Sequence, residues 1–418
     1  MASGPIGLLL GTEDDWPSAF EALLEQLGPV DWRGNRYELT TERIVNEPFD
    51  LRAKPRYSLV IDRLAWWYDL PRAWLKKVAL MDDVYLLNNP FTFQSMEKHS
   101  AYCAMMRLGL RVPETWLIPH KVPTPIAQFE YMAEKFPDVA ARYNAAFELG
   151  EIGERVGYPL FMKPFDGGQW VGVSRVVSPE ELRTTYDESG ARMMHVQSAL
   201  EDFDVFARSL SIGAETMVMR FEPDRPMHDR YQVAHAFLSP ELGWEVVTIS
   251  KLVNAFFRWE FNSCETIVKD GIAYPIDYAN ASPDVAITSL HYYFPWAMRA
   301  LVRWCAFCVV TERSMRVDLD TREYFSVGDR DDLSADDKLR EYRRLADEYF
   351  ETARYEEFVA GSLARLDEVT FDYFEGDAFD DLLVATVRST FPEHEQERFV
   401  EHYRGLIGAW VADQGAVR

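Results

Sequence analysis

The stretch YPLFMKPFDGGQWVGVSRV at residues 158–176 constrains the fold more than any other part of the chain. A short apolar run leads to Lys163, and Asp166, Gly167 and Gly168 follow at once, which predicts a strand edge and then a tight loop. Glycine allows backbone N–H groups to approach phosphate oxygens closely, and Lys163 would supply a fixed positive charge beside them. A hairpin with a surface lysine has the same sequence signature, so this segment alone leaves both interpretations open.

The length and composition of the chain predict a folded protein with several lobes. Its 418 residues exceed the size of about 250 to 300 residues at which a single core stops growing. Apolar residues make up 48% of the sequence, which excludes a disordered chain. The formal net charge of -24 repels polyanions, so we expect no nucleic acid partner, although a few cations in a cleft can still bind a nucleotide.

We expect a cytoplasmic protein with no membrane partner. No apolar run approaches about 20 residues, and the first residues lack the basic and apolar regions of a signal peptide. Four cysteines are too few for a disulfide framework in a chain of this length. Cys305 and Cys308 form a CxxC inside an apolar run, and we favour burial in a helical core over metal or redox chemistry because no second ligand pair accompanies them.

The fold class that these patterns predict combines α/β and α+β parts. Four parts are expected, at residues 1–94 (an N-terminal α/β lobe), 95–194 (a second lobe with an insertion at 119–150), 195–312 (a third lobe) and 313–418 (an acidic helical extension). Strands are expected where short apolar runs lie between turn residues, at 6–10, 57–61, 84–87, 116–118, 160–164, 171–177, 194–198, 205–212, 215–221, 233–238 and 273–278. Helical spacing predicts helices at 16–27, from 95 to about 109, and at 179–185.

Two carboxylates lie in the segment FNSCETIVKDGIAYPIDYANASPDV, which begins at residue 261. Glu265 lies in one apolar run and Asp277 in the next, and the turn KDG between them predicts a hairpin with both acids on adjacent strands. Asn280 adds a neutral oxygen. Two carboxylates and an amide, together with phosphate oxygens, suit Mg²⁺. The alternative is that Asp277 and Asn280 only cap the turn that follows.

The glycine segment and the acid hairpin, in this order, resemble the ATP-grasp superfamily of ATP-dependent ligases. The resemblance covers about residues 95–284, with the small α/β lobe in the expected place ahead of it. It implies an ATP-grasp fold with an N-terminal pre-ATP-grasp lobe and a C-terminal helical extension. It also implies ATP and Mg²⁺ as cofactors, and a small-molecule carboxylate and an amine as substrates.

By this resemblance, Lys98 matches the family lysine that reaches the nucleotide from a helix. Lys163 matches the second phosphate-binding lysine, and Asp166, Gly167 and Gly168 match the flexible loop over the phosphates. The spacing between the two lysines is long for the family, and the insertion at 119–150 would account for it.

The resemblance also places the base and the ribose of the nucleotide. Gln197 and Leu200 match the hinge strand, where Gln197 would hold the adenine amino group and Leu200 would supply backbone contacts. Asp204 matches the acid that binds the ribose hydroxyls. Without the family, Gln197 and Asp204 would be ordinary polar residues at the end of a strand.

Glu265, Asp277 and Asn280 match the metal ligands of the family, with one departure. One residue more separates Asp277 from Asn280 than in the usual acid-x-Asn pattern. An extra residue turns a side chain to the other face of a strand unless a bulge absorbs it. Glu265 and Asp277 are therefore the firmer predictions.

Four cations are candidates for stabilising the negative charge of a transferring phosphoryl group. They are Arg208, Arg220, Arg258 and Lys251. For each of them a surface ion pair is the alternative.

The implied activity is that of a carboxylate–amine ligase, which forms an acyl phosphate with ATP before the amine attacks. Two alternatives stay open, a phosphotransferase that uses the same cleft and a nucleotide-binding protein that has lost catalysis. The helical extension could cover the cleft, form a homodimer or simply pack on the other lobes.

Overall fold

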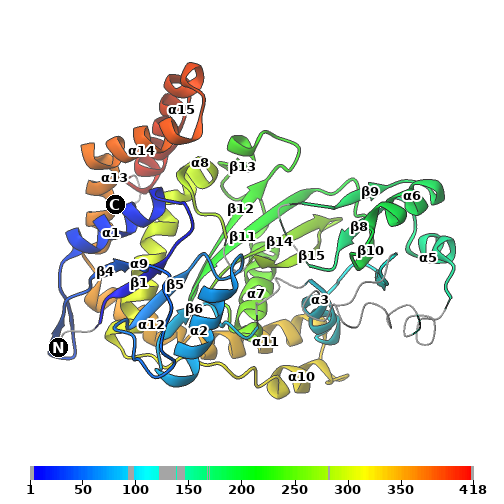
Figure 1. Ribbon diagram of the computed structural model, residues 1–418, viewed down its shortest axis with the longest axis horizontal. Coiled ribbons are helices and arrows are strands. Elements are labelled where there is room, and N and C mark those ends of the chain that lie inside the picture. Colours follow the sequence, from blue (N-terminus) through cyan, green and yellow to red (C-terminus); the bar gives the residue numbers. More distant parts are fainter. Residues whose placement is uncertain are drawn as a thin grey trace.

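The computed structural model describes residues 4–92, 98–121, 138, 146–166, 168, 170–280 and 283–415. It is a mixed α/β structure in which the described residues form a parallel sheet, a small two-stranded antiparallel sheet and two larger antiparallel sheets, followed by a series of helices (Figure 1). Within the described part of the chain, no helix has both the length and the apolar content to span a bilayer.

The N-terminal part contains a parallel sheet with the strand order β4-β1-β5-β6. All residues of β1 and β5 are buried, as expected for a parallel sheet with helices against it. The elements are β1 (Ile6–Leu9), α1 (Asp15–Leu27), β2 (Val30–Trp32), β3 (Asn35–Tyr37), β4 (Thr41–Arg43), β5 (Leu59–Asp62), α2 (Asp69–Met81) and β6 (Tyr85–Leu87). The three strands and the helix predicted here are confirmed, with ends that differ by one or two residues.

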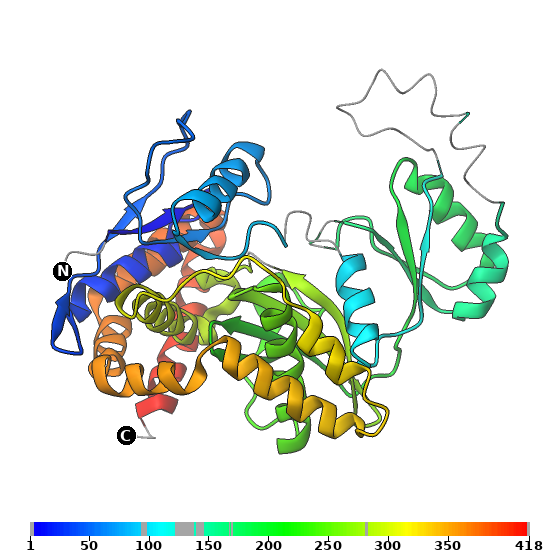
Figure 2. The same ribbon diagram turned by 90° about the horizontal axis from the view of Figure 1, so that it is seen from below.

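The second part is a smaller lobe built on an antiparallel sheet with the order β7-β10-β8-β9. Its elements are α3 (Lys98–Arg107), β7 (Thr115–Ile118), α5 (Leu149–Val156), β8 (Leu160–Pro164), β9 (Ser174–Val176), α6 (Pro179–Ser189) and β10 (Met194–Ser198). One face of the sheet forms a separate apolar core with α5 and α6. Figure 2 shows this lobe beside the larger body, with α3 (cyan) between them. Most of the predicted insertion at 119–150 lies outside the described residues.

The third part is a five-stranded antiparallel sheet with the order β13-β12-β11-β14-β15, and α7 packs across it. Its elements are β11 (Val205–Ile212), β12 (Glu215–Phe221), η2 (Met227–Asp229), β13 (Tyr231–Gln232), α7 (Pro240–Phe257), β14 (Phe261–Lys269) and β15 (Ile272–Asn280). The strand predicted at 233–238 is wrong. Pairing with β12 ends at Gln232, and the chain then turns toward α7, whose N-terminus Ser239 caps.

The C-terminal part is helical from Ile287 onward, which is earlier than the predicted start of the helical extension at residue 313, and it packs back on the N-terminal lobe. Its elements are α8 (Ile287–Leu290), η3 (His291–Tyr293), α9 (Phe294–Val310), α10 (Arg322–Gly328), α11 (Ala335–Tyr349), α12 (Thr352–Ser362), α13 (Leu366–Glu375), α14 (Asp377–Thr390) and α15 (Glu393–Gly415). Helix α1 contacts α9, α13 and α14 (Figure 1). Cys305 and Cys308 are buried in α9 as free thiols, which agrees with the predicted structural burial.

Candidate functional site

The open face of the small sheet carries the first group of predicted site residues. Side chains alternate along β8, so that Leu160, Met162 and Pro164 are buried while Lys163 lies on the opposite face. Lys163 is directly opposite His195 in the register of β8 and β10, and residues in such pairs share a face. Two residues farther along β10, Gln197 lies on the same face.

The β14–β15 hairpin carries the second group, and it forms as predicted. Glu265 and Asp277 are direct partners in the register, so their carboxylates stand side by side on adjacent strands. The register shifts on both sides of this pair, and Asn280 is opposite Ser263. A bulge thus absorbs the extra residue before Asn280.

A third charge extends this row across the sheet. Arg208 on β11 is directly opposite Glu265, and its guanidinium lies 3.9 Å from Glu265 Oε1. The guanidinium stacks on the rings of Phe221 and Tyr231 at 5.4 and 5.7 Å, which holds it in place. Burial raises the pKa of Glu265 above its usual range although Arg208 opposes this effect.

The two lysines approach the acid pair from the small lobe. Lys98 begins α3, which packs against β15, and its ammonium lies 2.9 Å from Asp277 Oδ2. Burial disfavours the charged form of Lys98, but Asp277 outweighs this and the pKa of the lysine is raised. Burial lowers the pKa of Lys163 to about 8, against the opposing attraction of Asp277.

The remaining predicted cations have other partners. Arg220 is half-exposed, and its Nε donates a hydrogen bond of 3.0 Å to Glu222. Arg258 caps the end of α7 in the left-handed region, and it is buried with its guanidinium donating to the carbonyls of Asp318 and Leu319. Because its donors are used on the backbone, the predicted catalytic role of Arg258 does not fit the structure.

Lys251, the fourth candidate cation, is also committed to a partner. Its ammonium lies 2.8 Å from Asp347 of α11 and is buried there. A structural ion pair is therefore the better interpretation.

The predicted base and ribose residues lie at the end of β10. Gln197 Oε1 accepts a hydrogen bond of 2.7 Å from Lys163 Nζ. Leu200 is half-buried and packs on the main core. Asp204 is exposed, and its backbone N–H donates to the carbonyl of Val268. The structure thus brings Gln197 to a lysine and leaves Asp204 accessible at the start of β11.

The predicted phosphate loop follows β8. Asp166 is exposed, and its charge acts on Lys98 across the site. The Gly168 carbonyl accepts a hydrogen bond from Val171, and Trp170 between them has a φ of 63°. Gly167 lies outside the described residues.

Three residues that the sequence did not single out complete the site. His99 and Tyr102 of α3 pack against His195, and the His99 Nδ1 to His195 Nε2 distance is 3.3 Å. The Tyr102 hydroxyl donates 2.9 Å to the carbonyl of Ile276 on β15. Burial, aided by His99, lowers the pKa of His195 to about 3, so the ring is neutral. The period of two along β10, with Gln197, could have placed His195 on the site face.

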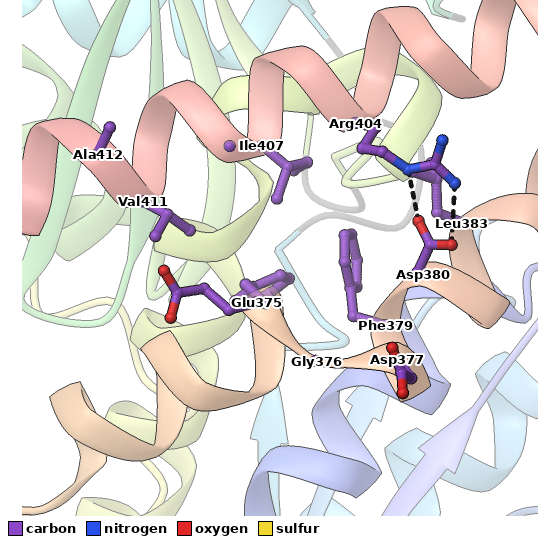
Figure 3. Close-up of a pocket in the computed structure, with 12 residues that line it drawn as sticks. Glu375, Gly376, Asp377, Phe379, Asp380, Leu383, Arg404, Ile407, Val411 and Ala412 are labelled. Atoms are coloured by element: carbon purple, nitrogen blue, oxygen red, sulfur yellow. Dashed lines mark hydrogen bonds and ion pairs between the residues drawn. The ribbon is translucent and has the colours of Figure 1, made fainter.

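A hollow of about 610 Å³ lies elsewhere, between α13, α14 and α15 (Figure 3). Phe379 of α14 and Ile407 of α15 line it, and Arg404 of α15 pairs with Asp380 of α14. None of the predicted site residues lines it.

No protein-family model and no curated protein matches the sequence. Solved structures do match. The D-alanine–D-alanine ligase from Bacillus anthracis complexed with ATP is 14% identical, with a TM-score of 0.47, over 85% of this chain and 99% of that chain. The RimK domain ATP-grasp protein from Sphaerobacter thermophilus is 12% identical, with a TM-score of 0.44, over 67% and 92%. A RiPP-associated ATP-grasp ligase from Chryseobacterium gregarium is 11% identical, with a TM-score of 0.46, over 75% and 98%.

Two of these three structures are described as ATP-grasp proteins. This is the superfamily that the sequence motifs resemble. Matches at these identities and TM-scores do not assign roles to individual residues, so the roles are argued from the side-chain contacts described above.

Proposed function

We propose that the chain is an ATP- and Mg²⁺-dependent ligase that activates a small-molecule carboxylate as an acyl phosphate and joins it to an amine. One observation carries the proposal. Lys98 and Lys163, from different elements of the small lobe, converge on the Glu265–Asp277 pair of the large sheet, where Arg208 lies on the other side. Such a ring of cations around two acids is suited to holding a polyphosphate with a divalent cation.

The two acids fit a magnesium site. Mg²⁺ is usually held by one or two carboxylates and completes its shell with phosphate oxygens and water. Glu265 and Asp277 supply two adjacent carboxylates, and the described residues contain no cluster of three His, Cys, Asp or Glu that would make a closed protein cage. Bound there, the ion would neutralise phosphate charge. Asn280 follows the bulge and is the weaker candidate ligand.

The lysines and the arginine of the site would stabilise the negative charge that develops during phosphoryl transfer. A carboxylate that attacks a phosphate brings two anions together, and Lys98, Lys163 and Arg208 would offset that repulsion. Oriented charges in a cleft that excludes water are worth far more than the same charges in solution. The loop that begins at Asp166 would shield the acyl phosphate from hydrolysis. The amine then attacks the acyl carbon and releases phosphate.

The ligase is separable from the two alternatives by its products. The protein is incubated with ATP, Mg²⁺ and candidate carboxylates, with hydroxylamine as a generic nucleophile. ADP with hydroxamate supports the ligase, whereas a stable phosphorylated product without hydroxamate supports a phosphotransferase. Nucleotide binding without turnover of any candidate would support lost catalysis, and no binding by calorimetry would refute all three.

Two substitutions test the assigned roles. Lys163→Ala and Glu265→Ala should each abolish turnover while the far-UV circular dichroism spectrum stays that of the wild type, because neither side chain belongs to an apolar core. Arg220→Ala is the matched control, since the half-exposed Arg220 side chain pairs with Glu222, two residues along the chain. Wild-type rates in either of the first two variants would refute the roles. The cytoplasmic location and the homodimer stay predictions.

A further inference from the structure

The side-chain amide of Gln197 is buried between the strands and contacts a partner at each end. At one end Oε1 accepts from Lys163 at 2.7 Å. At the other end Nε2 donates to Thr115 Oγ1, also at 2.7 Å. Gln197 is 1% exposed, so water cannot replace either partner at low cost.

The chemistry of these partners fixes the orientation of the amide. An ammonium is only a donor, so the end next to Lys163 must be the oxygen. The Thr115 hydroxyl donates its own proton to the carbonyl of Pro113 at 2.7 Å, so its oxygen is left to accept from Nε2. A flipped amide would place donor against donor at Lys163.

We propose that Thr115 is a positioning residue of the nucleotide site, which acts through Gln197 to hold the Lys163 ammonium in place for phosphate. This inference rests on the proposed function. It gives Gln197 a different task from the adenine contact that the family resemblance implies. Thr115 itself lies on β7, one strand farther from Lys163, and does not touch the lysine.

Removal of the Thr115 hydroxyl deprives the buried Nε2 group of Gln197 of this hydrogen-bond acceptor. The amide is then held at its oxygen end alone, so the contact between Oε1 and the Lys163 ammonium becomes less ordered. A lysine that must be ordered again when phosphate binds contributes less to affinity. The loss should therefore appear in the binding of phosphate and should depend on the presence of Lys163.

Binding of a non-hydrolysable ATP analogue with Mg²⁺ is measured by calorimetry. Thr115→Val should weaken it by about tenfold, and Thr115→Ser, which keeps the hydroxyl, should stay within about twofold of the wild type. Thr184→Val is the matched control, because Thr184 lies exposed on α6 and bonds only the Glu180 carbonyl. In a Lys163→Met background, Thr115→Val should have no further effect. If Thr115→Val does not fold, Thr115→Ala removes the same hydroxyl.

A second measurement needs no nucleotide. The rate at which an amine-reactive reagent labels each lysine is followed by peptide mass spectrometry. Labelling of Lys163 should be several-fold faster in Thr115→Val and unchanged in Thr115→Ser, while labelling of Lys98, which Asp277 holds, should not change in either variant.

The outcomes separate this inference from the proposed function. If the wild type does not bind the analogue, the proposed function fails, and the labelling rates still decide whether Thr115 holds Lys163. If the wild type binds the analogue and Thr115→Val binds it equally well, the positioning role is overturned. The role is also overturned if Thr115→Val lowers the affinity as much in the Lys163→Met background as in the wild-type background. Equal labelling of Lys163 in the wild type and Thr115→Val would overturn it as well.

Discussion

Raising the pH should weaken nucleotide binding through the loss of one charge, that of Lys163. Burial holds the pKa of this lysine at about 8. A group with that pKa is about 90% charged at pH 7 and about 10% charged at pH 9. If only the ammonium form binds phosphate, the affinity for an ATP analogue should not change with pH below pH 7. Above pH 8 it should decrease, with a limiting slope of about tenfold per pH unit.

Affinity is the quantity to measure, because the acceptor amine of a ligase also titrates in this range and would distort turnover. Calorimetric titrations between pH 6 and pH 10 give the profile of the wild type. Lys163→Arg is the control, since a guanidinium stays charged above pH 12. Its profile should be flat even if its affinity is lower throughout. A wild-type profile that stays flat to pH 9.5, or a Lys163→Arg profile that falls in the same way, would refute the reasoning.

Deprotonation of Lys163 does not destabilise the folded protein, so unfolding caused by this residue cannot explain a loss of affinity at high pH. The pKa of Lys163 in the folded protein is lowered from its ordinary value of 10.5. Between pH 8 and pH 10.5 the unfolded chain therefore binds more protons at this residue than the folded chain does. Stability rises with pH wherever the unfolded state binds more protons, so the titration of Lys163 stabilises the fold in that window. A melting temperature recorded at each pH checks this directly.

Three further predictions concern Arg208, Arg258 and Gly213, which have different roles. Arg208→Gln should remove turnover and leave the melting temperature near that of the wild type. Arg258→Gln should keep turnover and lose about 2 to 3 kcal/mol of stability in urea titrations, because the buried, charged guanidinium donates to three backbone carbonyls. The opposite pattern would reverse the two assignments. Gly213→Ala should cost about 2 to 5 kcal/mol in the same titrations, because φ is 55° and a Cβ would lie 1.9 Å from the Trp304 ring; a cost below about 0.5 kcal/mol would contradict this.

The local parts of the site could be predicted from the sequence. Glu265 and Asp277 lie in apolar runs around a KDG turn, and turn residues between apolar runs specify a hairpin without help from the rest of the chain. Lys163 could be placed at the open face because the alternation of side chains along β8 is regular. These local patterns therefore predict where a strand lies and on which face of the sheet each of its side chains is.

The partners of the charged residues could not be predicted in this way. The pair of Lys98 with Asp277 joins the first residue of helix α3 to a residue of strand β15, and nothing in either local segment encodes their approach. No local sequence pattern distinguishes Arg258 from the other arginines. Its structural role depends on its position at the end of α7 and on the carbonyls around it. The bulge before Asn280 depends on the registration of two strands, which a single strand does not reveal.

The helical extension is part of the core rather than a cover for the site. Glu260, 1% exposed and just ahead of β14, accepts hydrogen bonds from Tyr85 of the N-terminal sheet, Trp304 of α9 and Tyr349 of α11, and it pairs with Arg313 at 2.8 Å. A buried carboxylate that loses its partner costs about 3 to 5 kcal/mol. The strand that carries Glu265 is therefore anchored at its start by residues from the extension, and the position of the acid pair depends on these helices although none of them supplies a site residue.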